Sequence, residues 1–129
     1  MIAGVADTHP ALWYVFGDPR LSASAKSALE TAAGSRQKIV VSVISLAEIV
    51  YLVEKGRLPA SAYTDLQTAL RDLDHVLQEA PVTAEIIDAM LEVPRADIPD
   101  MPDRIVAATA VYFGVPAISR DGRIRASNI

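Results

Sequence analysis

The chain has 129 residues, of which 51% are hydrophobic and 22% charged, a balance that predicts one compact domain over residues 1–129. No run approaches the roughly 18 apolar residues of a membrane span, and we recognise no signal-peptide pattern at the N-terminus. The absence of cysteine excludes disulfides and thiolate metal sites, and it fits a reducing cytoplasm.

The net charge of −4 is unusual for a nonspecific nucleic-acid binder, because such proteins are mostly basic. The net charge is less informative than the positions of the charged residues in the sequence. If four of the 16 acidic residues bound divalent cations, the remaining acids would balance the 12 lysines and arginines. A metal-dependent nuclease is therefore compatible with this composition.

The first half of the chain alternates between strand and helix signals. The apolar run Ile2–Ala6 predicts a buried strand, and Thr8 with Pro10 begins a helix that Gly17 ends. Ser22 is placed to cap a second helix that reaches about residue 33. In "KIVVSVISLAEIVYL" the β-branched residues 39–44 predict a strand, and residues 45–55 predict the helix that follows it.

The second half continues the alternation. Leucines at positions 66, 70, 73 and 77 predict a long amphipathic helix over residues 59–78, followed by a short extended piece at 80–82. A helix over 83–91 leads to a proline-rich loop, and an apolar helix over 103–113 ends at Gly114. Residues 115–119 predict a fourth strand, from which "RDGR" leads away.

This order predicts an α/β fold with three layers, in which helices cover both faces of a central, mainly parallel sheet. Sites in such folds form at the carboxyl ends of the strands. Four acids have that placement: Asp7 follows the first strand, Glu48 lies one turn into the next helix, Asp103 begins the apolar helix, and Asp121 follows the fourth strand. We therefore expect these four carboxylates to converge at one edge of the sheet.

Four ionised acids in one pocket need compensation, because two carboxylates about 5 Å apart repel by about 3 kcal/mol at an effective dielectric near 20. Oxygen ligands of this kind suit Mg²⁺ or Mn²⁺. A pair of such ions can activate water and stabilise the leaving oxygen of a phosphodiester. Taken singly, each acid also fits a structural role as a helix cap, a first-turn acid or a turn residue. Only their joint placement indicates phosphoryl chemistry.

The segments that carry these acids, "VADTHPALWYV", "SVISLAEIVYL" and "PDRIVAATAVYFGVPAISRD", resemble PIN-domain ribonucleases, particularly the VapC-type toxins of bacterial toxin–antitoxin pairs. The resemblance covers essentially the whole chain. It implies a Mg²⁺- or Mn²⁺-dependent endoribonuclease in which Asp7, Glu48, Asp103 and Asp121 bind the metal. It also implies a homodimer that is inhibited by a cognate antitoxin protein. The chain departs from the family at "RASNI", where relatives usually add a short last strand.

Several polar residues near these acids have more than one reading. Asp100 either holds a metal-bound water or is a solvated loop residue, and Ser119 and Ser45 are able to hydrogen-bond a carboxylate. We expect His9 to be structural or to contact substrate, because metal-activated water requires no separate base. Arg104 is rotated by about 100° from Asp103 along the helix, so it could pair with another acid or approach an RNA phosphate.

A second group consists of basic and aromatic residues. Arg120, Arg123 and Arg125 flank Asp121, where they either offset phosphate charge or are simply solvated. Trp13 and Tyr14 are expected to be core or dimer contacts rather than platforms for base stacking.

Two other functions remain as alternatives. A catalytically inert PIN-like binding module would be marked by the loss of an acid, and none of the four is missing. A metal-dependent phosphatase with Asp7 as nucleophile would want a second aspartate two residues later, where His9 stands.

Overall fold

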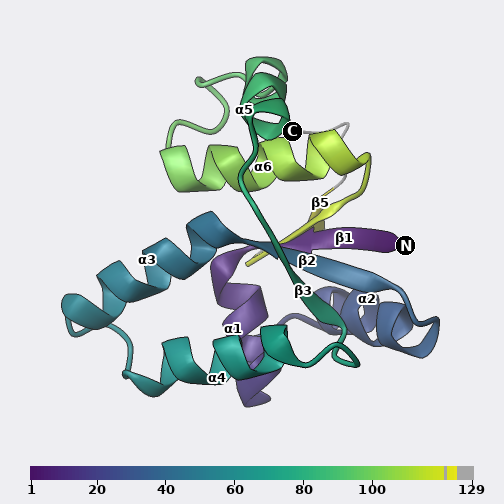
Figure 1. Cartoon of the computed structure of the whole chain (residues 1–129), viewed down its shortest axis with the longest axis vertical. Coiled ribbons are helices and arrows are strands. Elements are labelled where there is room, and N and C mark those ends of the chain that lie inside the picture. Colours follow the sequence, from purple (N-terminus) through teal and green to yellow (C-terminus); the bar gives the residue numbers. More distant parts are fainter. Residues whose placement is uncertain (121, 125–129) are drawn as a thin grey trace.

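The computed structural model describes residues 1–120 and 122–124 of the chain. A five-stranded sheet in the order β3-β2-β1-β4-β5 forms the middle layer. The first four of these strands run parallel, and β5 is antiparallel to β4. Figure 1 shows α5 and α6 over one face of the sheet and α1, α2 and α4 over the other. The expected three-layer α/β fold with a mainly parallel sheet is confirmed.

The elements have the following bounds: β1 Ile2–Ala6, α1 Thr8–Phe16, α2 Ala23–Gly34, β2 Lys38–Ser42, α3 Val43–Glu54, α4 Ser61–Arg71, β3 Leu77–Ala80, α5 Ala84–Ala89, the 3₁₀ helix η1 Met90–Glu92, α6 Met101–Phe113, β4 Ala117–Ser119 and β5 Gly122–Ile124. None of the described helices is long and apolar enough to cross a membrane.

Helix ends follow the expected capping chemistry. The Ser22 hydroxyl accepts a hydrogen bond from the Ala25 amide at the start of α2. Gly17 and Gly114 end α1 and α6 in the left-handed conformation, with φ of 63° and 66°, which suits glycine because it has no Cβ. The strand expected over 39–44 stops at Ser42, because the Ser42 hydroxyl caps α3 by accepting from the Ile44 amide.

The helix expected over residues 59–78 is wrong in its second half. Helix α4 ends at Arg71, and the Asp72 side chain accepts from the Asp74 amide in the turn that follows. Leu73 is 88% exposed, whereas Leu77 lies in β3 and pairs with β2. Leucines spaced four, three and four residues apart fit a helix, but the backbone bonds and burial available beside β2 favour a strand.

Two apolar layers hold the helices to the sheet. On one face, buried residues of α1, α2, α3 and α4 pack with the sheet, among them Leu29, Ile49 and Leu66. On the other face, α6 packs on β1 and β2 through Val106 and Ala110. The run of residues 105–110 is buried throughout, as the sequence predicts. Helix α6 therefore lies on the sheet, and its first turn carries Asp103.

Candidate active site

Asp7 is fixed at the carboxyl end of β1. Its amide donates to the Ile118 carbonyl of β4 at 2.9 Å, and its carboxylate accepts from the Thr8 amide at 2.8 Å. Burial raises the pKa of Asp7, the Thr8 hydrogen bond opposes that rise, and the negative charge of Glu48 adds to it. Asp7 is thus the N-cap of α1, one of the roles that the sequence allows. It is also a partly buried acid near Glu48.

Glu48 reaches the same place from α3. The Thr8 hydroxyl donates a hydrogen bond to Glu48 Oε1 at 2.6 Å, although the two residues are 40 positions apart. Thr8 is only 1% exposed, so this bond is shielded from water on the threonine side. Sequence reasoning missed the role of Thr8. The signal available was a hydroxyl residue directly after Asp7, which shares the helix start with it.

Asp103 enters from the first turn of α6. The pKa of Asp103 is raised from its ordinary value of 3.8 to about 6. Burial is the largest cause, followed by the negative charges of Asp7, Asp100 and Glu48, while Arg120 opposes the rise. Three predicted site acids from three separate elements therefore act on one another electrostatically. The fourth, Asp121, lies outside the described residues.

Asp100 and Arg104, which flank Asp103, have structural partners. The Asp100 carboxylate caps α6 by accepting from the Asp103 amide at 3.0 Å. The Arg104 guanidinium donates to the carbonyls of Val93 at 3.0 Å and Met90 at 2.9 Å. Arg104 thus anchors η1 to α6, and among the described residues it pairs with no acid.

The remaining polar candidates, Ser45, His9 and Ser119, lie on α3, α1 and β4. The Ser45 hydroxyl is fully buried, lies one turn before Glu48 on α3, and has no hydrogen-bond partner in the described part of the chain. The pKa of His9 is lowered, mainly by burial and then by the positive charge of Arg120. Ser119 is the last residue of β4.

The chemistry of these donors fits a hard divalent cation. Asp7, Glu48 and Asp103 bring carboxylate groups to the carboxyl ends of the strands, and after burial the negative charge of Glu48 adds to the rise in the pKa of both Asp7 and Asp103. The buried Ser45 hydroxyl lies one turn before Glu48 on α3 and has no hydrogen-bond partner among the described residues. Among the described residues, however, no group of three His, Asp or Glu side chains is arranged so that it could hold a metal ion.

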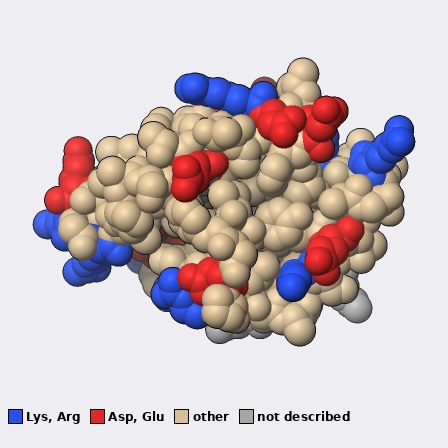
Figure 2. Space-filling model, turned by 90° about the horizontal axis from the view of Figure 1, so that it is seen from below, with Lys and Arg blue, Asp and Glu red and all other residues tan. Residues whose placement is uncertain are grey.

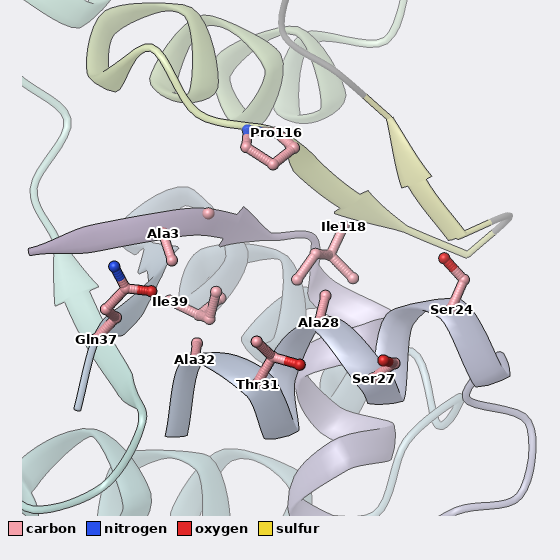
Figure 3. A pocket seen from close by; sticks show the side chains of 11 residues that line it. Ala3, Ser24, Ser27, Ala28, Thr31, Ala32, Gln37, Ile39, Pro116 and Ile118 are labelled. Carbon is pink, nitrogen blue, oxygen red and sulfur yellow. The ribbon is translucent and has the colours of Figure 1, made fainter. Parts of the chain in front are cut away.

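A separate cavity of about 530 Å³ lies between α2 and the sheet (Figure 3). Its described lining comprises Ala3, Gly4, Ser24, Ser27, Ala28, Thr31, Ala32, Gln37, Ile39, Pro116 and Ile118. No acid, base or nucleophilic thiol is among these residues, so the cavity offers no hydrolytic chemistry, in contrast to the edge where the acids meet.

Acids at the carboxyl ends of the strands of a parallel sheet are compatible with hydrolysis of phosphate esters, and comparison with known proteins identifies the family. The PIN-domain family model matches residues 5–128, and the chain belongs to that family. It is similar to "Ribonuclease VapC22" of Mycobacterium tuberculosis, with 26% identity over 125 residues that cover 97% of this chain and 92% of the relative.

The fold is shared with a solved structure as well. A chain in the crystal structure of VapBC2 from Rickettsia felis, bound to a DNA fragment from its promoter, superposes with a TM-score of 0.64 at 21% identity. The match covers 91% of this chain and 86% of the other.

Proposed function

We propose that this protein is an endoribonuclease that depends on Mg²⁺ or Mn²⁺ and hydrolyses phosphodiester bonds in RNA. The observation that carries the proposal is the approach of three carboxylates: burial, and then the negative charges that include Asp7 and Glu48, raise the pKa of Asp103 to about 6. Membership of the PIN-domain family and the similarity to a ribonuclease support the same reaction.

Asp7, Glu48 and Asp103 are the residues that would hold the ion, with Asp121 as the fourth acid. A bound divalent ion supplies an activated water and stabilises the charge on the leaving oxygen. The neighbouring residues of the protein hold these carboxylates in position. Thr8 fixes the Glu48 carboxylate, and the bond between the Asp7 amide and β4 fixes the start of α1.

The test is cleavage of single-stranded RNA by purified protein with Mg²⁺, with Mn²⁺ and with chelator. We expect activity only with a divalent ion, and a loss of activity in Asp7→Asn, which keeps the size of the side chain but removes a ligand charge. Asp65→Asn is the matched control, because Asp65 is an exposed acid on α4. Cleavage that persists in chelator, or in Asp7→Asn at the wild-type rate, would overturn the proposal.

We further propose that the protein is the toxin of a toxin–antitoxin pair in the cytoplasm and that a cognate antitoxin protein inhibits it. The similarities to a VapC ribonuclease and to a chain of a VapBC complex support this assignment. The first check is a small open reading frame immediately upstream that encodes a DNA-binding protein. Co-expression of that protein should restore the growth of cells that produce this chain. Failure to restore growth would indicate a housekeeping nuclease rather than a toxin.

A homodimer completes the proposal. Figure 2, a view from the side of α1, α2 and α4, shows charged side chains scattered around broad uncharged areas. Large apolar side chains are exposed on the first helix and on α3, including Phe16 at 43% and Tyr51 at 55%. Light scattering should report twice the monomer mass at micromolar concentration, and a monomer there would count against this assembly.

A further inference from the structure

Trp13 is the only tryptophan of the chain. It lies on the same side of α1 as His9, which follows Asp7 by two positions. The two rings are four residues apart, one turn of helix, and their centroids are 5.6 Å apart. Trp13 lies six positions after Asp7, a rise of ~9 Å along the helix axis. The indole is half-buried, so part of it is open to solvent.

Two guanidinium groups approach this ring from different segments. The Arg20 guanidinium lies 5.3 Å from the ring centroid, and that of Arg120 lies 6.0 Å from it. Arg20 is held by Asp18, with a closest contact of 2.7 Å. Arg120 follows β4, is exposed, and forms no salt bridge with a described residue. One aromatic ring therefore contacts two cations that come from different segments.

A cavity continues the same surface beyond the ring. It has a volume of about 480 Å³ and is lined by Trp13, Tyr14, Gly17, Asp18, Pro19, Leu21, Ala23 and Lys26. Its volume falls within the range of roughly 300 to 1,000 Å³ that is usual for small-ligand sites. Its lining combines two aromatic side chains with an exposed lysine, which suits a planar ring that carries a phosphate.

We propose that Trp13, Arg20 and Arg120 form a substrate subsite, in which a base of the single-stranded RNA stacks on the indole and the guanidinium groups bind the flanking phosphates. The inference rests on the proposed ribonuclease function and extends it to the path of the strand, from the acids along α1 toward the cavity. Every base has a π-face, so a stacking site of this kind tolerates many sequences. This proposal differs from the sequence-based expectation that Trp13 is a core or dimer contact.

The charges around the acids favour a polyanion as the occupant. Arg120 opposes the rise in the pKa of Asp7 and Asp103, and its guanidinium lies 6.0 Å from the centroid of the Trp13 ring, so one cation is near both the acids and the indole. A strand whose phosphate lies at the acids thus meets Arg120 next and Arg20 beyond it. Arginine is suited to this contact because its planar group both stacks and binds phosphate.

Trp13 itself provides the first readout, because all tryptophan emission of the protein comes from this one ring. The probe is a short single-stranded RNA pool of mixed sequence, added to the Asp103→Asn protein to limit cleavage. We expect saturable quenching of the emission that weakens as salt is added. RNA that binds, as judged by the anisotropy of a labelled strand, without changing the Trp13 emission would overturn the proposal.

The second readout is kinetic. Trp13→Leu should raise KM about 10- to 100-fold with kcat nearly unchanged, and Trp13→Phe should restore most of the affinity. Arg120→Gln should raise KM and lower the slope of log KM against log salt by about one. Arg71→Gln is the matched control, because Arg71 is an exposed arginine at the end of α4 that has neither a cation–π contact with Trp13 nor a salt bridge among the described residues.

An unchanged KM in both Trp13→Leu and Arg120→Gln would refute the subsite. If Trp13→Leu fails to fold, as judged by circular dichroism, Arg120→Gln and the emission of the intact indole still decide the matter. A wild-type protein that cleaves no RNA would defeat the proposed function alone, since quenching of Trp13 by RNA would still support the binding site.

Discussion

Replacement of Thr8 by valine isolates the bond between α1 and α3 without changing the volume of the side chain. The Thr8 hydroxyl donates to Glu48 Oε1 at 2.6 Å, and Thr8 is 1% exposed. A hydrogen bond to a charged group contributes about 1.5–3 kcal/mol. If that free energy holds Glu48 in its working position, its loss lowers kcat/KM about 10- to 150-fold, because each ~1.4 kcal/mol is a factor of ten.

The effect on stability should be smaller than the effect on catalysis. Glu48 is only half-buried, so water can replace the hydroxyl when the hydrogen bond is lost. We expect Thr8→Val to lose about 1 kcal/mol of unfolding free energy, which lowers the melting temperature by roughly 4 °C in a domain of this size. Thr8→Ser keeps the hydroxyl and should retain most of the activity.

The assay compares RNA cleavage by the wild type, Thr8→Val and Thr8→Ser over a titration of Mg²⁺. If Thr8 positions a metal-binding carboxylate, the valine variant needs about 10- to 100-fold more Mg²⁺ for half-maximal activity, and excess Mg²⁺ recovers part of the rate. A merely structural role would leave the Mg²⁺ requirement unchanged. Equal impairment of the serine and valine variants would also refute the reasoning, because only one of them lacks the donor.

Three more outcomes follow from the same geometry. Asp7→Asn should abolish cleavage but leave the melting temperature in chelator within a few degrees of the wild type, since the asparagine oxygen still caps the helix and the repulsion from Glu48 is relieved; a large fall in that temperature would mark the Asp7 charge as chiefly structural. The pKa of Asp103 is higher in the folded protein, about 6, than its ordinary 3.8, so the folded state binds the proton more tightly. Stability in chelator should therefore fall as pH rises from about 4 through 6, and Asp103→Asn should flatten that fall in thermal melts; an identical profile in the variant would contradict the assignment. Arg104→Gln should lose about 1.5–3 kcal/mol in chemical denaturation, because the carbonyls of Met90 and Val93 lose a charged donor, yet it should cleave RNA at close to the wild-type rate. A variant of Arg104 that is stable but inactive would show that this side chain contacts the substrate.

The local features of this protein could be predicted from the sequence because their causes lie within a few residues. A hydroxyl or carboxylate at a helix start bonds an amide up to three positions away, as Ser22 does, and a glycine ends a helix through its own φ. Apolar β-branched runs predict buried strands, and their alternation with helices predicts a parallel sheet. That topology in turn predicts the meeting of Asp7, Glu48 and Asp103 at one edge.

Contacts between distant segments depend on how the helices pack, and no local pattern encodes them. Residues 72–77 carry a helical leucine spacing, but the open side of β2 offers backbone hydrogen bonds that turn Leu77 into a strand residue. The Thr8–Glu48 bond depends on the angle at which α3 leaves the sheet beside α1. Arg104 bonds carbonyls 11 and 14 residues away rather than an acid, because the packing of η1 brings those carbonyls to it. Likewise, only the folded chain brings Arg20 and Arg120 to Trp13, since a side chain's neighbours across space are set by the packing of whole elements and not by its neighbours in sequence.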